Sequence, residues 1–157
     1  MIPINAHPDL HIVLFEPEIP ANTGNIGRLC VGTTSTMHLI KPFRFLMDDK
    51  SLKRAGLDYW HKLKLIIHEN WEDFLSNQAP PRFILCTTKS TNNLYEYRFE
   101  PGDYLIFGPE SRGLPAPLLE SYPYNTISIP MHDDIRSINL SNAVAIVLYE
   151  AIRQIEF

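Results

Sequence analysis

Six short runs of apolar residues recur along the chain, and we expect each of them to form a β-strand. They cover residues 11–15, 37–40, 64–68, 82–88, 103–107 and 126–129. In several runs the apolar residues are consecutive and do not alternate with polar ones. This is typical of strands covered on both faces, as in a parallel sheet between helices. The pattern therefore predicts a mainly parallel, six-stranded sheet.

Helix signals lie between these runs. Asn22 marks a helix start, and Asn70 with Asp73 resembles a capping box. We expect helices over about 22–32, 48–56, 71–77 and 137–154. The last segment carries a broad apolar stripe at helical spacing, made of Leu140, Val144, Val147, Leu148, Ala151, Ile152 and Ile155. Strands alternating with helices indicate an α/β fold.

The chain has the length of one ordinary domain, 157 residues, with 45% hydrophobic and 20% charged residues. We expect a single domain over residues 1–157, with 1–9 as a loose N-terminal tail. The longest uncharged apolar run, 143–148, is too short to span a bilayer, and the first ten residues lack the features of a signal peptide. We therefore expect a cytoplasmic protein with no membrane partner.

Polar and glycine-containing loops follow four of the predicted strands. They read "EPEIPANTG", "TTKST", "GPESRG" and "IPMHDDIRSINLS". In open parallel sheets, ligands bind beyond the carboxyl ends of the strands. The four loops are therefore predicted to meet in one site.

Several kinds of site chemistry lack their motifs. The chain has no GxxxxGK[ST], no GxGxxG after the first strand and no GxSxG, which argues against phosphate cradles and serine hydrolases. The loops instead carry amides, hydroxyls and a few arginines. Such groups suit a reaction catalysed by orienting two bound reactants.

Cysteine and histidine usage gives little support for a metal. Cys30 and Cys86 lie among apolar neighbours without CxxC spacing, so we expect buried free thiols. His132, Asp133 and Asp134 form the only local group of possible ligands, which is a weak metal signal. We expect no metal.

The formal net charge of −4 argues against indiscriminate nucleic-acid binding, but basic residues crowd one region. They are Lys41, Arg44, Lys50, Lys53, Arg54, Lys62 and Lys64. A solvated helix face explains this crowding, and so does a local patch that contacts phosphates.

Three of these stretches together resemble a known family. "LFEPEIPANTGNIGRLC", "YLIFGPESRGLP" and "IPMHDDIRSINLSNAVAIVLYEA" are similar to the three motifs of SPOUT-class RNA methyltransferases, and within them to the tRNA (cytidine/uridine-34-2′-O)-methyltransferases. "DDKSLKRAGLDY" extends the match, which covers nearly the whole chain from about residue 10. As a combined pattern it is highly specific.

The resemblance implies an α/β fold whose C-terminal part forms a trefoil knot, and a homodimer that binds S-adenosylmethionine in the knot. The implied reaction methylates the ribose 2′-hydroxyl of tRNA nucleotide 34, in leucine tRNAs for the closest relatives, and leaves S-adenosylhomocysteine. The anticodon stem-loop would then be the partner. Phosphate contacts would come from Lys50, Lys53, Arg54, Lys62, Lys64, Lys89 and Arg112.

Site residues follow from the resemblance position by position. Arg28 and Asn139 match the catalytic candidates. The supporting residues are Asn22, Glu110, Arg112, Ser137 and Ser141. The cofactor-binding positions are Cys86, Gly108, Ile129, Ser137 and Ile138. Since a guanidinium stays protonated, Arg28 would stabilise alkoxide charge or hold a phosphate and would not act as a base.

Structural roles explain some of these residues equally well. Arg28 has the pattern of a surface arginine, and Glu110 with Arg112 suits a clasp within one loop. Ser137 or Asn139 suits a helix cap. Packing explains Met131 and Tyr149 better than cofactor contact does.

One departure from the family pattern concerns the substrate. Asp133 and Asp134 stand where relatives carry small neutral residues, and their charge opposes incoming phosphate unless they point to solvent. Two alternatives remain open: a ribosomal RNA 2′-O-methyltransferase, and a noncatalytic knotted RNA-binding factor. A small-molecule methyltransferase or nucleotide-binding module suits the basic region less well.

Overall fold

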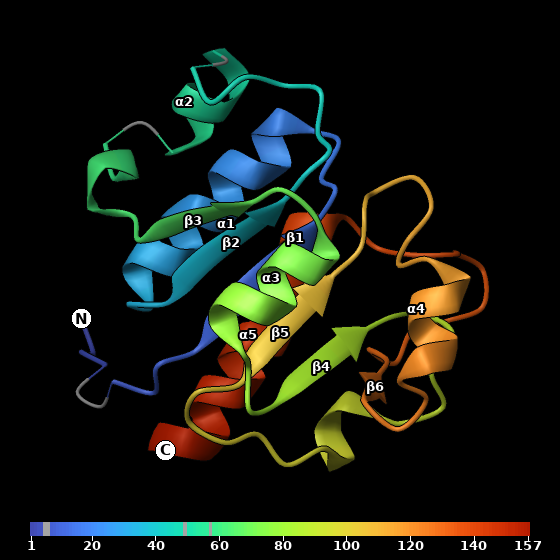
Figure 1. Ribbon diagram of the computed structural model, residues 1–157. Coiled ribbons are helices and arrows are strands. Elements are labelled where there is room, and N and C mark those ends of the chain that lie inside the picture. Colours follow the sequence, from blue (N-terminus) through green and yellow to red (C-terminus); the bar gives the residue numbers. More distant parts are fainter. Residues whose placement is uncertain (5–6, 49, 57) are drawn as a thin grey trace.

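The computed structural model describes residues 1–4, 7–48, 50–56 and 58–157. Its centre is a six-stranded sheet in the order β3-β2-β1-β5-β4-β6 (Figure 1). The strands are β1 (His11–Phe15), β2 (Thr36–Ile40), β3 (Leu65–His68), β4 (Phe83–Cys86), β5 (Tyr104–Phe107) and β6 (Thr126–Ile127). All five pairings between neighbouring strands are parallel. The predicted sheet is thus confirmed, with one strand for each apolar run.

The sixth strand is shorter than the predicted 126–129. After Ile127 the chain leaves β4, because the Ser128 N–H donates to the Asn92 carbonyl at 2.8 Å and Ser128 pairs with Asn93 as an isolated bridge. The polar segment after β4 thus lies beside the segment after β6.

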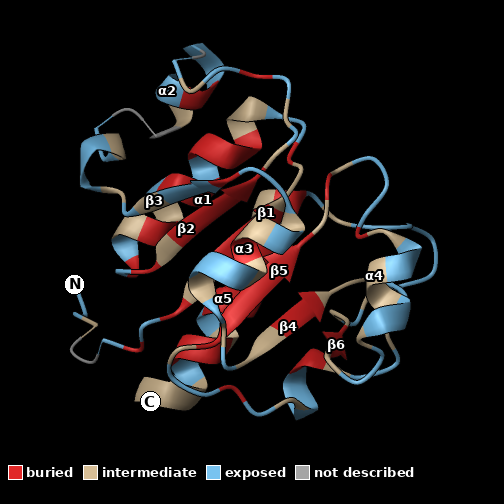
Figure 2. Cartoon of the chain, in the orientation of Figure 1, coloured by how far each residue is buried: buried red, intermediate tan, exposed pale blue. Residues whose placement is uncertain are grey.

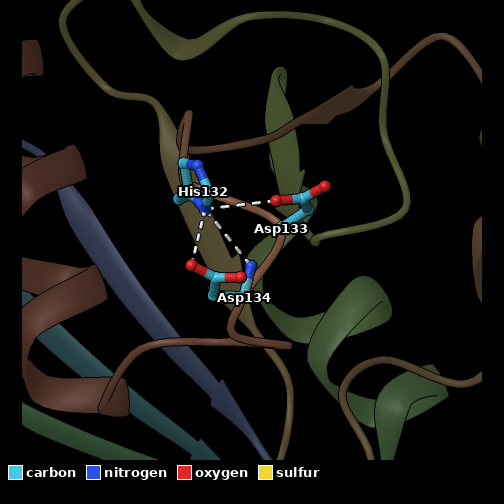
Figure 3. Close-up of side chains that lie close together, drawn as sticks. All are labelled: His132, Asp133 and Asp134. Atoms are coloured by element: carbon cyan, nitrogen blue, oxygen red, sulfur yellow. Dashed lines mark hydrogen bonds and ion pairs between the residues drawn. The ribbon is translucent and has the colours of Figure 1, made fainter.

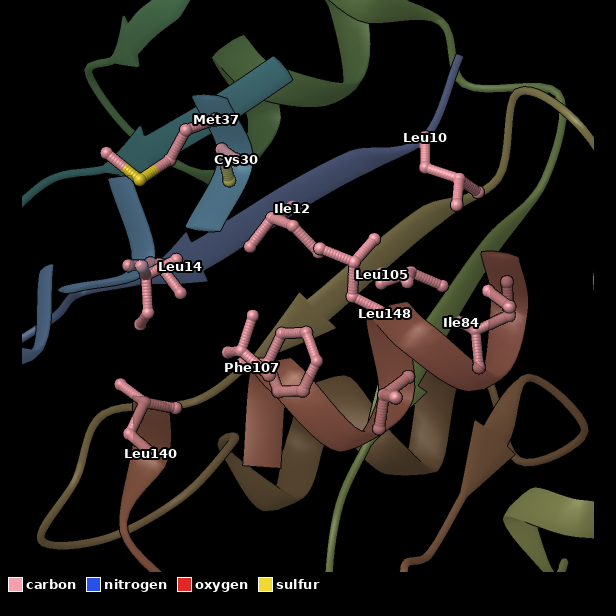
Figure 4. Close-up of a cluster of buried hydrophobic side chains, with 14 of the residues drawn as sticks. Leu10, Ile12, Leu14, Cys30, Met37, Ile84, Leu105, Phe107, Leu140 and Leu148 are labelled. Carbon is pink, nitrogen blue, oxygen red and sulfur yellow. The ribbon is translucent and has the colours of Figure 1, made fainter. Parts of the chain in front are cut away.

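Helices cover both faces of the sheet, as the consecutive apolar positions predict (Figure 2). On one face, α1 (Pro20–Gly32) and α5 (Leu140–Glu156) pack against alternate strand residues, which Figure 4 shows around Ile12, Leu105 and Leu148. On the other face, Phe74 of α3 (Trp71–Gln78) is fully buried, and α4 (Ala116–Ser121) packs beside it.

The first helix begins earlier than predicted. Pro20 is its first residue and Ile19 precedes it without a side-chain cap, so Asn22 lies inside the first turn. Proline suits this start, because the N–H it lacks would have no partner there. The amide of Asn22 is therefore available for other contacts.

Two other helices begin directly after an asparagine whose side chain caps the helix. Asn70 caps α3 by accepting from the Asp73 N–H at 2.7 Å, as predicted, while the Asp73 carboxylate accepts from the Glu69 N–H at 3.0 Å. Asn139 caps α5, so this helix starts at Leu140 and not at Ser137.

The short helix α2 (Lys50–Gly56) lies within the predicted segment 48–56. Its acidic start is not seen, because Asp48 precedes the helix and Asp49 lies outside the described residues. The 3-10 helices η1 (Trp60–Lys62) and η2 (Leu94–Glu96) were not predicted, and neither was α4. Each has six residues or fewer, too few for a helical period to emerge.

Two buried histidines, His38 and His68, and the partly buried His11 form a hydrogen-bonded row across β1, β2 and β3. His11 Nδ1 lies 2.9 Å from His38 Nε2, and His38 Nδ1 lies 3.0 Å from His68 Nε2. Burial, with the neighbouring His11 and His68, lowers the pKa of His38 to about 3. The row is therefore neutral at ordinary pH and belongs to the core.

The N-terminal segment lies close to the turn before β5. Ahead of β1 the described residues form no helix or strand, although the Pro8 carbonyl accepts from the Gly102 N–H at 2.9 Å. No helix among the described residues is long and apolar enough to cross a bilayer. The trefoil knot stays a prediction.

Candidate functional site

A cavity of about 650 Å³ opens beyond the carboxyl ends of β4, β5 and β6. All four loops predicted to share a site contribute to its lining. They supply Ile19, Asn22, Thr87, Thr88, Lys89, Gly108, Pro109, Glu110, Ser111, Arg112, Gly113, Ile129, Met131, Arg136, Ser137, Ile138 and Asn139. The sequence argument from strand ends is confirmed in this respect.

The loop after β1 and the loop after β5 clasp one another at the cavity mouth. The Glu110 carboxylate accepts from the backbone N–H groups of Glu18, at 2.8 Å, and Ile19, at 3.1 Å. In return, the Glu18 carboxylate accepts from the Ser111 N–H at 2.9 Å and from its hydroxyl at 2.7 Å. These bonds lower the pKa of Glu18. Two carboxylates thus hold the loops in a reciprocal clasp.

Arg112 adds a third contact between the same loops. Its guanidinium lies 3.2 Å from the Glu16 carboxylate, where the chain turns with a φ of 48° at Glu16. The sequence-based alternative of a Glu110–Arg112 clasp within one loop is therefore wrong. Each of the two residues binds the loop after β1 instead, because the parallel order places β1 directly beside β5.

A chain of side-chain amides continues from this clasp into the C-terminal motif. Asn22 donates from Nδ2 to Glu110 at 3.3 Å, and Asn139 donates from Nδ2 to Oδ1 of Asn22 at 3.1 Å. Oδ1 of Asn139 accepts from the N–H groups of Ser141, at 2.9 Å, and Asn142, at 3.3 Å. One hydrogen-bonded chain therefore joins all three motifs.

The direction of this amide chain is determined at both ends. Helix N–H groups only donate, so Asn139 must turn its oxygen toward α5 and its nitrogen toward Asn22. A carboxylate only accepts, so Asn22 must turn its nitrogen toward Glu110. In each of the two asparagines, one N–H of the amide is used in this hydrogen-bonded row and the other N–H is not. To a ligand, Asn139 therefore offers a donor, because its oxygen already serves the helix cap.

Gly108 lines the cavity, and the structure gives a specific reason for glycine there. A Cβ built on Gly108 would lie 2.3 Å from the Leu114 nitrogen and 2.4 Å from the Gly113 carbonyl carbon. The loop folds back so closely on its own start that only glycine fits. Close approach to a cofactor was predicted for Gly108, whereas the close contact in the structure is with the loop backbone.

Apolar side chains form the inner wall of the cavity. They are Cys86, Phe107, Leu114, Ile127, Ile129, Ile138, Leu140, Ala143 and Val147. Burial raises the pKa of the Cys86 thiol, so this group is neutral. Cys30, which is fully buried and also free, is neutral for the same reason. Cys86 is the less buried of the two and lines the cavity, where the family resemblance places it as a cofactor-binding position. Met131 lines the cavity as well, although packing was expected for it.

Two predicted site residues lie outside this cavity. Ser141 does not line it but donates to Oδ1 of Asn139 from both its N–H and its hydroxyl. Arg28 is exposed, and its guanidinium lies over the ring of Tyr59, 4.9 Å from the centroid. Arg28 follows Asn22 by six residues on α1, about 9 Å along the helix axis, so the two side chains do not meet.

The acidic pair that departs from the family pattern points away from the protein. His132 Nδ1 lies 3.1 Å from a carboxylate oxygen of Asp133 and 3.1 Å from one of Asp134 (Figure 3). The Asp133 and Asp134 side chains are 97% and 86% exposed. Their charges therefore stay hydrated. The three groups lie within 4.8 Å of one another on one exposed loop, and the expected absence of a metal stays a prediction.

Sequence reasoning missed three charged residues of the site. Glu16 and Glu18 lie within the first quoted motif, directly after a strand, and that position was the available signal. Arg136 lines the cavity and also a neighbouring hollow of about 370 Å³. It was quoted within the third motif but given no role.

Comparisons with known proteins agree with these motifs. A family model described as the SpoU rRNA Methylase family matches residues 9–149. A relative named tRNA (cytidine(34)-2′-O)-methyltransferase, from Saccharophagus degradans, is 51% identical over 148 residues, which is 94% of this chain and 96% of the relative. A solved structure described as "Structural insights into the 2-OH methylation of C/U34 on tRNA" superposes with a TM-score of 0.87 at 46% identity, covering 94% of this chain and 97% of that one.

A more distant solved structure has the same fold. It is the SpoU methyltransferase AviRb from Streptomyces viridochromogenes in complex with the cofactor AdoMet, with a TM-score of 0.78 at 23% identity. The superposition covers 94% of this chain and 60% of that one.

Proposed function

The chain belongs to the SpoU rRNA Methylase family, and from this premise we propose that it methylates the ribose 2′-hydroxyl of nucleotide 34, a cytidine or uridine, in tRNA. The methyl group comes from S-adenosylmethionine. One observation carries the proposal: the three motif loops converge on one cavity and are joined through Glu110, Asn22 and Asn139. The relative named for cytidine 34 supports nucleotide 34 as the target, because its 51% identity extends over 94% of the chain.

The cavity suits S-adenosylmethionine in size and in chemistry. Its volume of about 650 Å³ lies in the range of small-molecule sites, about 300–1,000 Å³. Cys86, Ile129 and Ile138 would wall the adenosine, with Ser137 as a polar contact and Gly108 at the turn. When bound, the cofactor supplies a methyl group on a sulfonium sulfur.

The reaction forms a bond between the ribose 2′-oxygen and the methyl carbon and breaks the sulfur–methyl bond, which leaves S-adenosylhomocysteine and a released proton. Asn139 serves as a donor toward the ligand, since its oxygen is engaged at the cap of α5. Glu110 is the only carboxylate among the described cavity-lining residues, and it already accepts three hydrogen bonds. We therefore assign Glu110 to positioning.

Arg28 takes part in this mechanism if the protein is a homodimer, which we propose. Its exposed guanidinium does not line the cavity of its own chain, so in the proposed dimer it reaches the cavity of the partner subunit. There it stabilises the oxygen as the proton leaves, which a permanently charged guanidinium does well. Exposed apolar side chains one turn apart on α5, Ile146 and Tyr149, support a dimer surface on this helix.

The proposed RNA partner is the anticodon stem-loop of tRNA. Lys50, Lys53, Arg54, Lys62 and Lys64 are exposed, and they form no ion pair with any carboxylate in the described ranges. Lys41 differs, because it pairs with Glu69 at 3.0 Å. Unpaired cations on one region suit phosphate contacts, and the solvent-facing Asp133 and Asp134 need not oppose them.

The decisive experiment measures transfer of a tritiated methyl group from S-adenosylmethionine to unmodified tRNA, with leucine tRNAs first, followed by nuclease digestion and nucleoside identification. We expect a 2′-O-methylated pyrimidine at position 34. An anticodon stem-loop with a 2′-deoxynucleotide at position 34 is the matched control and should accept no methyl.

The same assay separates the alternatives. Transfer to ribosomal RNA in place of tRNA would replace the proposal with a ribosomal RNA 2′-O-methyltransferase. Absence of both transfer and S-adenosylmethionine binding, measured by calorimetry, would favour the noncatalytic RNA-binding factor. Cofactor binding without transfer would direct the search to other tRNAs or to a prior base modification.

A further inference from the structure

The ring of Tyr59 lies against the guanidinium of Arg28. The family resemblance assigns this tyrosine no role. The Arg28 guanidinium carbon lies 4.9 Å from the centroid of the Tyr59 ring. Within the described part of the chain, no carboxylate forms an ion pair with Arg28. The aromatic ring is thus the neighbour that the structure gives this cation.

An arginine held over an aromatic ring differs from a salt-bridged arginine in how many of its N–H donors remain available to a ligand. The charge of the guanidinium is attracted to the electrons of the ring, and this contact uses no hydrogen-bond acceptor for the five N–H donors. A carboxylate partner would occupy two of those donors and neutralise the charge. Stacking on Tyr59 keeps both the charge and the donors of Arg28 available to a ligand.

The turn that carries Tyr59 packs directly on α1. Tyr59 precedes η1, and its carbonyl accepts from the Lys62 N–H at 2.9 Å. The next residue, Trp60, packs so closely on α1 that a Cβ built on Gly27 would lie 2.7 Å from its ring. The helix that carries Arg28 and the turn that carries Tyr59 are therefore held against each other at the residue before Arg28.

Helix α2 also packs closely on α1. A Cβ built on Gly24 would lie 2.4 Å from the Leu52 carbonyl oxygen of α2. The elements that pack on α1 here, α2 and η1, carry the exposed basic residues Lys53, Arg54 and Lys62. The stack thus lies within the basic region to which we assign the RNA phosphates.

We propose that Tyr59 is a positioning residue for methyl transfer, holding the Arg28 guanidinium outward with its N–H edge toward the ribose and phosphate of the nucleotide being methylated. This inference rests on the proposed function. It makes the phenyl ring, and not the phenolic hydroxyl, the part of Tyr59 that matters. A tyrosine that served only packing or base stacking would act independently of Arg28.

A double-mutant cycle separates these roles, because residues that act as one unit give non-additive effects. Tyr59→Leu, Arg28→Ala and the combined variant are compared by single-turnover methyl transfer to tRNA. Tyr59→Phe keeps the ring, and Tyr124→Leu, at a tyrosine that is 91% exposed, is the matched control. S-adenosylmethionine affinity and thermal midpoint are measured for every variant.

We expect Tyr59→Leu to lower the single-turnover rate by about two- to fivefold, the range of an exposed cation–π contact. Tyr59→Phe and Tyr124→Leu should keep the wild-type rate, and cofactor affinity should not change. In the Arg28→Ala background, Tyr59→Leu should have no further effect. An equal loss in both backgrounds, or a loss in Tyr59→Phe as large as in Tyr59→Leu, would overturn the inference.

The outcome also distinguishes this inference from the proposed function. An active wild type with additive variants removes the positioning role alone. A wild type that neither transfers methyl groups nor binds S-adenosylmethionine removes the proposed function. In that case the same five variants, compared by fluorescence anisotropy with an anticodon stem-loop, decide whether Tyr59 and Arg28 act together in holding RNA.

Discussion

Asn139 donates a hydrogen bond to Asn22 at 3.1 Å, although 117 positions separate the two residues in the sequence. The contact joins the first turn of α1 to the cap of α5, on the wall of the main cavity. Because Asn139 also caps α5, a substitution there changes both helix stability and the proposed site. The two effects need separate variants.

Asn139→Ser should separate the contribution of Asn139 to the cap of α5 from the contribution of its amide N–H to the site. Serine caps helices well, so the free energy of unfolding should stay near that of the wild type, while Asn139→Ala should lower it by about 1 kcal/mol. Both variants lose the amide N–H donor that reaches toward the cavity, and transfer should fall by about a hundredfold or more. Urea unfolding and single-turnover kinetics measure the two effects, and wild-type turnover in Asn139→Ser would remove Asn139 from the mechanism.

Arg28→Ala should retain folding and cofactor binding, while its single-turnover transfer rate should fall by about a hundredfold or more, because its charge acts in the transition state. Mixing Arg28→Ala with Asn139→Ala subunits tests the dimer. A mixed dimer combines an intact cavity on one subunit with an intact Arg28 on the other, so transfer should reappear after subunit exchange. A mixture as inactive as its two components would contradict action across the dimer.

Glu110→Gln should weaken the clasp between the loops after β1 and β5. A glutamine amide turns one N–H toward the donors of Glu18, Ile19 or Asn22, which leaves at least one of them without an acceptor. We expect the free energy of unfolding to fall by about 1 kcal/mol and transfer to fall with it. Glu120→Gln, at an exposed residue of α4, is the control and should change neither quantity.

The histidine row predicts an acid-sensitive core. The pKa of His38 is lowered to about 3, from 6.5, chiefly by burial, and burial also lowers the pKa values of His11 and His68. Between pH 6.5 and 3 the unfolded chain therefore binds protons that the folded chain does not, and stability falls as the pH falls. Each histidine contributes a slope of at most about 1.4 kcal/mol per pH unit.

Urea unfolding at several pH values measures that slope. His38→Gln should reduce it, whatever its effect on stability at pH 7, while His61→Gln, at an exposed residue, should leave it unchanged. A wild type whose stability is flat between pH 6.5 and 4 would contradict a neutral buried row.

Salt dependence tests the basic region. If Lys53 and Lys62 contact phosphates, replacing either with alanine should reduce the slope of log affinity against log salt by about 0.7–0.9. Lys41→Ala is the matched control, because Lys41 already pairs with Glu69 at 3.0 Å. Filter binding of tRNA across a salt series gives the slopes, and equal slopes for all variants would place the RNA elsewhere.

Much of the fold was predictable because its signals are local. Each strand is a short apolar run, and Leu140 to Ile152 repeat at helical spacing, so periodicity alone located them. The first residue of a helix was harder to predict. Asn22 has the chemistry of a cap, yet Pro20 starts α1, and the amide of Asn22 serves Glu110 and Asn139.

By itself, the sequence determined the α/β class, the number of strands and the edge of the sheet where the loops gather, because these follow from spacing along the chain. The tertiary structure alone decided the pairings: Glu110 with the loop after β1, Asn22 with Asn139, and Arg28 with Tyr59 outside the cavity. Such partners lie far apart in sequence. For Glu110, the placement of β1 beside β5 in the sheet order brings the two loops into hydrogen-bonding distance. Local periodicity carries no information about that order.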